Sequence, residues 1–179
     1  MLSSVFSRFA CFGFSGSREW VGSFTPLSVA AAVVPAGSRV LIGCAPGVDA
    51  FFRGAFPGAQ VFAVSSGQWG VGRGAFAARS IACVRAVAAG GGLWVSFPSS
   101  ACPAGLLPSS SSSRCFSGSG FGSWASLAFA LGSGVSCLVF LRSLPAPAGW
   151  GLSPVPGCPG WFGCSGALGS PAVVQLSLF

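Results

Sequence analysis

The feature that most constrains this chain is a repeated alternation of short, continuous apolar runs with small polar clusters and helical segments. Each apolar run has the length of a strand, and most are followed by a Gly or Ser cluster. Strands that are apolar along their whole length, rather than at every second residue, are typical of a parallel sheet covered on both faces. The pattern therefore predicts an α/β fold.

The expected elements follow one another in strand–helix order. The expected strands cover residues 9–14, 39–42, 60–64, 93–97 and 135–141, and the expected helices cover residues 25–34, 48–55, 75–89 and a segment capped by Ser123. This order is that of a Rossmann-like parallel sheet of about five strands flanked by helices on both faces, and we assign it residues 1–142. Residues 143–179 are rich in Pro, Gly and Trp, so we expect an irregular tail in which residues 172–179 could add a last strand.

Composition constrains the surface and the compartment. The chain is 52% hydrophobic and only 6% charged. A surface with so few charges is poorly soluble unless part of it is buried in an interface, so we expect a homo-oligomer. An uncharged run at residues 115–141 has the length of a membrane span, but its Gly and Ser residues interrupt it, so we do not expect a membrane protein. Eight Cys without a C-x-x-C pair indicate a reducing, cytoplasmic compartment.

The charged residues favour an anionic partner. The net charge of +7 comes from nine Arg, no Lys and two acids, Glu19 and Asp49. Guanidinium groups pair bidentately with oxyanions, so a set of basic residues made only of Arg suits phosphate. A compositional bias against Lys, Tyr and His is the alternative explanation of why all the basic residues are Arg. The absence of His excludes Ser-His-Asp and Cys-His catalysis and every His-containing metal site.

Small polar clusters follow four of the expected strands, at residues 15–18, 43–49, 65–67 and 118–123. Ligands of parallel sheets bind at these carboxyl ends, where glycine lets the backbone approach a phosphate and helix N-termini offer free N–H groups. One such cluster alone could be only a tight turn, but four at one edge indicate a site. The candidate ligand-binding residues are Gly16, Ser17, Arg18, Gly43, Gly47, Asp49, Ser65, Arg79, Gly118, Ser119, Gly120, Gly122 and Ser123.

Three charged candidates have alternative roles. Arg18 could clamp phosphate or be a solvated surface residue. Asp49 could be a dipole partner at a helix start, orient a ribose hydroxyl or pair with an Arg. Arg79 could be a second phosphate ligand or lie on a solvated helix face opposite the apolar one. The expected apolar face of that helix consists of Ala77, Ile81, Val84 and Ala88.

The segments that carry these candidates resemble, in order and spacing, those of the SLOG superfamily. It groups the DNA-processing protein A (Smf) family with the LOG nucleotide-monophosphate phosphoribohydrolases, and the resemblance covers residues 9–141. Residues 13–18, GFSGSR, resemble its T-G-S-R motif, and residues 42–53, IGCAPGVDAFFR, are similar to G-G-A-x-G-V-D-x-x-A-R. Residues 78–80, ARS, stand where the family has Arg-Asn or Arg-Lys, and residues 117–124, SGSGFGSW, resemble its S-x-G-T-W-type loop.

The resemblance implies a Rossmann-like domain, often dimeric, that binds a nucleotide or a nucleotide-derived, phosphate-bearing ligand. The LOG enzymes use P-G-G-x-G-T-x-x-E, and aligning Gly122 and Ser123 on its G-T puts Ser126 where the catalytic Glu belongs. We therefore expect binding without catalysis. Neither residues 70–74 nor residues 118–122 complete G-x-G-x-x-G, so we expect no nicotinamide or flavin cofactor.

Two alternatives remain open. Single-stranded DNA binding, as in DNA-processing protein A, would suit the net charge and the six Trp residues. A phosphoribohydrolase-like enzyme acting on nucleotide monophosphates is the other.

Overall fold

The computed structural model describes residues 2–118 and 122–169, apart from the side chain of Arg73. The helices are α1 Leu2–Phe6, α2 Thr25–Ala32, α3 Val48–Ala55, the 3-10 turn η1 Val64–Ser66, α4 Arg73–Ala89, α5 Ser112–Cys115, α6 Gly122–Gly132 and α7 Ser165–Leu168. The strands are β1 Cys11–Gly16, β2 Arg39–Gly43, β3 Gln60–Phe62, β4 Leu93–Phe97, β5 Ser136–Phe140, β6 Ser153–Pro154 and β7 Trp161–Gly163. No helix within these described ranges has both the length and the apolarity that a membrane crossing requires.

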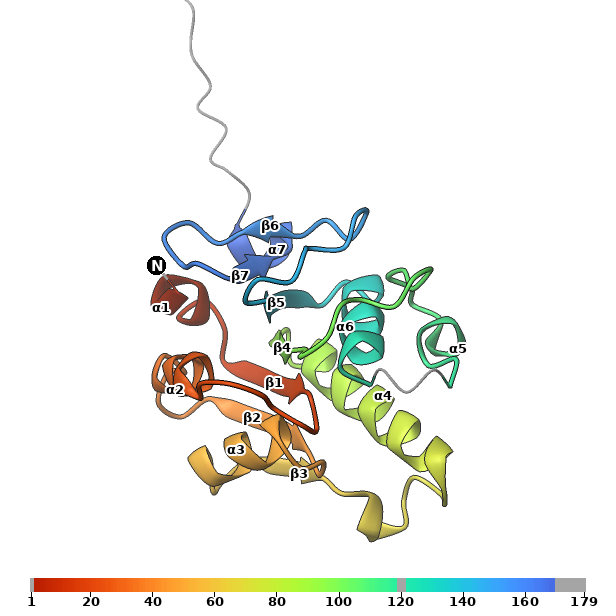
Figure 1. The fold of residues 1–179 in the computed structure, drawn as a ribbon. Coiled ribbons are helices and arrows are strands. Elements are labelled where there is room, and N and C mark those ends of the chain that lie inside the picture. Colours follow the sequence, from red (N-terminus) through yellow and green to blue (C-terminus); the bar gives the residue numbers. More distant parts are fainter. Residues whose placement is uncertain (1, 119–121, 170–179) are drawn as a thin grey trace, which may run out of the picture.

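The described strands form one mixed sheet in the order β3-β2-β1-β4-β5-β7-β6 (Figure 1). Strands β1 to β5 pair in parallel, whereas β7 is antiparallel to both β5 and β6. The expected α/β class and the helix-flanked sheet are therefore confirmed. The sheet has seven strands rather than about five, because a C-terminal hairpin extends it beyond β5.

Each face of the sheet has its own core. Phe14 of β1 stacks on Phe52 of α3 with ring centroids 4.0 Å apart, on the face covered by α2 and α3 (Figure 1). Trp94 of β4 belongs to the core on the other face, together with Val87 of α4 and Leu127 of α6. Both faces are buried, which explains why the strands are apolar along their whole length.

The helix expected at residues 75–89 begins at Arg73, and its buried face differs from the expected one. Ala88 is exposed and Arg79 is buried, so the solvated helix face, one of the two alternatives for Arg79, is wrong. The buried residues of α4 are Ala75, Arg79, Cys83, Val84 and Val87. Four of them follow each other at a spacing of four residues, so an Arg takes part in an otherwise apolar stripe.

The tail expected to be irregular contains β6, β7 and α7. Trp161 of β7 packs edge-on against Phe97 and also contacts Phe140, so the hairpin covers the edge of β5. Two- to four-residue elements are too short to show a period, which is why the sequence did not predict them. The strand expected at residues 172–179 lies outside the described residues.

Candidate functional site

A cavity of about 880 Å³ opens at the carboxyl ends of β1 and β4. Its wall comes from the loops after these two strands and from α4, α6 and the start of α3. Strands β1 and β4 are neighbours, yet the chain leaves β1 towards β2 on one side and returns from β3 to β4 on the other. The cavity therefore lies at the point where the strand order reverses, the usual ligand site of a parallel sheet.

Most of the sequence-predicted residues line this cavity. They are Gly16, Ser17, Arg18, Asp49, Arg79, Gly118, Gly122 and Ser123. Ser65 is exposed in η1 and is not among the residues that line it, because β3 is the edge strand, two positions away from β1. Ser119 and Gly120 lie outside the described residues. Ser123 lies in the first turn of α6, which begins at Gly122, instead of preceding the helix.

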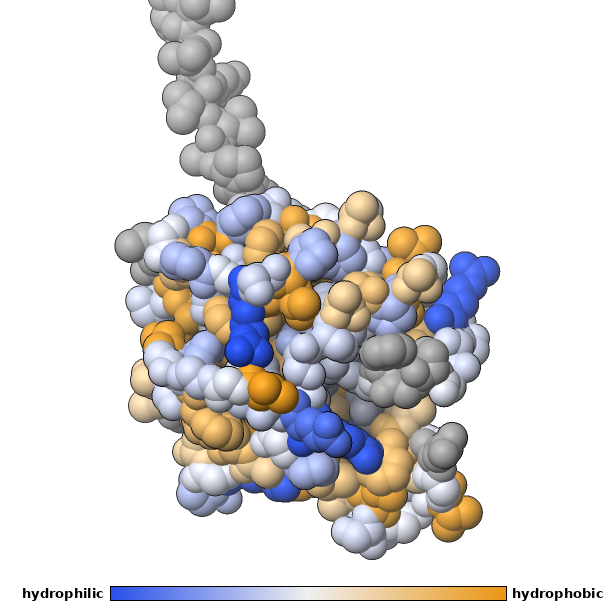
Figure 2. Space-filling model, in the orientation of Figure 1, coloured by the Kyte–Doolittle hydropathy of each residue, from blue (hydrophilic) through white to orange (hydrophobic). Residues whose placement is uncertain are grey.

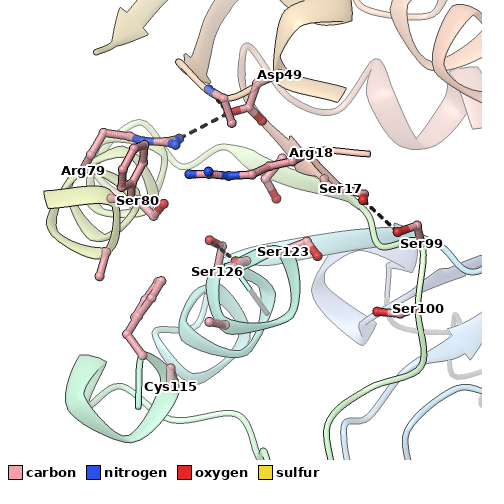
Figure 3. Close-up of a pocket in the computed structure, with 18 of the residues that line it drawn as sticks. Ser17, Arg18, Asp49, Arg79, Ser80, Ser99, Ser100, Cys115, Ser123 and Ser126 are labelled. Atoms are coloured by element: carbon pink, nitrogen blue, oxygen red, sulfur yellow. Dashed lines mark hydrogen bonds and ion pairs between the residues drawn. The ribbon is translucent and has the colours of Figure 1, made fainter. Parts of the chain in front are cut away.

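A buried ion pair forms the floor of the cavity. Asp49, in the first turn of α3, is 3% exposed. Its Oδ2 accepts hydrogen bonds from Nη1 of Arg79 at 3.3 Å and from the backbone N–H of Ala45 at 3.1 Å (Figure 3). Of the roles open to Asp49 from the sequence, the structure shows two, because Asp49 stands in the first turn of a helix and also pairs with an Arg.

Burial raises the pKa of Asp49, and this effect exceeds the opposing attraction of Arg79 and Arg53 and the hydrogen bond from Ala45. Arg53 does not contact the carboxylate. It donates from Nη1 to the carbonyl oxygens of Gly43 and Ala45, at 2.8 and 2.9 Å, and thereby fixes the loop that ends in Asp49.

Arg79 has unused hydrogen-bond donors. The guanidinium makes one hydrogen bond among the described residues, from Nη1 to Asp49, and its Nε is buried without a partner. The side chain is 9% exposed and lines the cavity. Buried donors without acceptors cost free energy, so this group is suited to a ligand that brings an oxyanion.

Gly43 and Gly47 do not line the cavity, but they allow its floor to form. A Cβ atom on Gly43 would overlap the guanidinium of Arg79 and the carboxylate of Asp49. Gly47 has a φ of 69°, and its Cβ atom would overlap the backbone at Ser17 and Arg18. These two glycines let the loop before α3 approach both the ion pair and the loop after β1.

The rim of the cavity, which includes Arg18, Phe76 and Ser99, is more exposed than the floor. Arg18 extends across the cavity towards α4, where Arg79 and Ser80 lie (Figure 3). Its Cζ lies 4.5 Å from the ring centroid of Phe76, in a cation–π contact. Figure 2 shows that strongly hydrophilic residues are few on this face and stand among apolar ones.

Serine hydroxyls supply most other polar groups of the wall. Ser99, after β4, donates to Ser17 Oγ at 2.7 Å, and Ser17 donates to the carbonyl oxygen of Glu19 at 2.9 Å. Four further lining hydroxyls have no partner among the described residues: Ser80, Ser100, Ser117 and Ser123. Nothing in the sequence indicated Phe76, Ser99 or Ser100, since none of them belongs to a motif or to a glycine cluster.

Ser126, which stands where the resemblance to the SLOG superfamily would put the catalytic Glu, also lines the cavity. It is buried, and its hydroxyl donates to the carbonyl oxygen of Gly122 at 2.7 Å within α6. The acidic residues of the chain, Glu19 and Asp49, both line the cavity, but the carboxylate of Asp49 is held by Arg79 and Ala45.

Most of the tryptophans are not available for stacking on a ligand. Four of the six are buried, namely Trp94, Trp124, Trp150 and Trp161. Trp20 and Trp69 are partly buried, and their indole N–H groups donate to the carbonyl oxygens of Ser23 and Ala63.

Comparison with protein families, with curated proteins and with solved structures finds no match for this chain. The geometry of the cavity therefore carries the functional argument.

Proposed function

We propose that the cavity binds a nucleotide or a nucleotide-derived ligand through its phosphate. The observation that carries the proposal is that the guanidinium of Arg79 lines the cavity and makes one hydrogen bond among the described residues, to Asp49, so that other donors remain for a ligand. A phosphate oxygen is an acceptor that these donors can use, and the ion pair to Asp49 holds the group in place before the ligand arrives.

Other groups of the wall support the same ligand. Arg18 brings a second guanidinium, and the first residues of α6, Gly122 and Ser123, face the cavity. The N–H groups of the first helical turn have no partner inside the helix, which favours an anion there. The four serine hydroxyls without a partner among the described residues can bond the hydroxyl groups of a ribose.

The location of the cavity supports a Rossmann-like domain, because the parallel strands run in the order β3-β2-β1-β4-β5 and the cavity lies where that order reverses. The four segments on which the SLOG resemblance rests all contribute residues to the cavity or to its floor. The volume of the cavity is within the range of small-molecule sites.

We propose binding without hydrolysis. Ser126 has no acid or base function, and the carboxylate of Asp49 accepts hydrogen bonds from Arg79 and Ala45. Single-stranded DNA is the weaker alternative, because four of the six tryptophans that would stack on bases are buried.

The test is binding of adenosine 5′-monophosphate to the wild type, to Arg18→Ala and to Arg39→Ala. Arg39 is a matched control because it is exposed at the start of β2, where it bonds Gln60, at the opposite end of the sheet from the cavity. We expect the nucleotide to raise the melting temperature of the wild type and of Arg39→Ala but not of Arg18→Ala. Arg18→Ala should itself change stability by at most about 1 kcal/mol, since it removes one exposed cation–π contact.

The outcome also separates the alternatives. No shift with adenosine monophosphate, guanosine monophosphate or inorganic phosphate would overturn the proposal. Tight, strongly salt-dependent binding of an oligothymidylate would favour DNA binding, and release of free adenine would establish a hydrolase.

A further inference from the structure

Among the described residues other than glycine, Arg142 alone has a positive φ, of 58°. It stands two residues after the end of β5 and lies in the left-handed region, which residues with a Cβ rarely adopt. Such a conformation persists where surrounding contacts hold it, so the contacts of its side chain bear on its role.

The side chain of Arg142 reaches the loop after β1, residues 17–24, which is 121 positions away in sequence. Its Nη1 donates to the carbonyl oxygen of Val21 at 2.7 Å, and its Cζ lies 5.6 Å from the ring centroid of Trp20. A Cβ atom on Gly22 would overlap its Nη2. Three consecutive loop residues are thus fitted to one guanidinium.

The same loop forms part of the cavity wall. Arg18, Glu19 and Val21 line the cavity, whereas Arg142 does not. Trp20, in the middle of the loop, packs edge-on against Phe97 at the end of β4, with ring centroids 6.0 Å apart. The loop is therefore attached to β4 at Phe97, through the ring of Trp20 and the backbone N–H of Ser17, and to the segment after β5 at Arg142.

We infer that Arg142 is a positioning residue, which holds the loop after β1 so that Arg18 faces the ligand cavity. The consequence for binding rests on the proposed function, whereas the attachment of the loop does not. Arg142 touches no ligand in this scheme. Its guanidinium fixes the backbone of Val21 and the ring of Trp20, and the loop carries Arg18 three residues before Val21.

The decisive variant is Arg142→Gly, which removes the guanidinium and keeps a residue that adopts a positive φ without strain, so the fold is retained. The first measurement is the exchange with water of the Trp20 indole N–H, which donates to Ser23 in the loop, followed by NMR without ligand. We expect it to accelerate about tenfold in Arg142→Gly and to stay unchanged in the control Arg39→Ala.

The second measurement is the affinity for adenosine 5′-monophosphate by calorimetry. We expect it to fall about tenfold in Arg142→Gly, with no fall in the melting temperature of the free protein, and to be partly restored in Arg142→Lys. A merely structural residue would lower the melting temperature and leave the affinity of the folded fraction unchanged.

The two measurements test the inference and the proposed function separately. Unchanged indole exchange would overturn the inference whether or not the nucleotide binds. Faster exchange with unchanged affinity would also overturn it, because the loop would then not belong to the site. If the wild type binds no nucleotide, the proposed function fails, and the indole exchange alone decides whether Arg142 holds the loop.

Discussion

The floor and the rim of the cavity are built in different ways. On the floor, Asp49 and Arg79 are both less than 10% exposed and form an ion pair. On the rim, Arg18 is exposed, and its contact is with the ring of Phe76. The floor is thus fixed by the fold before any ligand arrives, whereas on the rim the backbone is held and the exposed side chain of Arg18 can adjust. We therefore expect changes on the floor to affect stability first and changes on the rim to affect affinity first.

The largest expected effect is on the floor. Asp49→Ala leaves the guanidinium of Arg79 buried without its counter-ion, and we expect a loss of about 3–5 kcal/mol in the free energy of unfolding. Denaturant unfolding measures it. The double variant Asp49→Ala/Arg79→Ala is the control, because it removes both charges and should lose less than Asp49→Ala alone. An equal or greater loss in the double variant would show that the ion pair does not determine the stability of the floor.

A smaller effect is expected where the floor meets the rim. Gly47→Ala places a Cβ atom against the backbone at Ser17 and Arg18, at a φ of 69°, so strain and overlap add to about 3 kcal/mol. Gly37→Ala is the control, because Gly37 also has a positive φ, of 78°, but has open space around it. Gly37→Ala should cost only the strain. Equal losses of unfolding free energy in the two variants would rule out a close approach at Gly47.

The smallest expected effect is a pH dependence. Burial raises the pKa of Asp49 above its value in the unfolded chain. Between the two pKa values the folded chain binds more protons, so the contribution of Asp49 to the free energy of unfolding falls as the pH rises through that interval. Denaturant unfolding from mildly acidic to neutral pH, compared between the wild type and Asp49→Asn, measures this contribution. A contribution that rises with pH would show that Arg79 outweighs burial.

The sequence predicted the floor better than the rim. Gly43, Gly47 and Asp49 stand in one short segment, and the physical need for two small residues and an acid is local to it. The burial of Arg79 was not predicted, since a helix of mostly small residues offers two apolar faces and only packing selects one.

Rim residues such as Phe76 and Ser99 gave no signal, because their contacts with Arg18 and Ser17 join segments that are far apart in the sequence. The same holds for Arg142, whose contacts with Trp20 and Val21 link distant parts of the chain.

By itself the sequence determined the α/β class, the five parallel strands and the clustering of small residues at their carboxyl ends. These follow from local hydrophobic periods and from the backbone freedom of glycine. Both signals depend only on neighbouring residues in the sequence. Three features depend on tertiary contacts: the C-terminal hairpin extends the sheet, Arg79 pairs with Asp49, and Arg142 reaches the loop after β1. Those are contacts between distant segments, and their free energy depends on burial and on distances that no local pattern encodes.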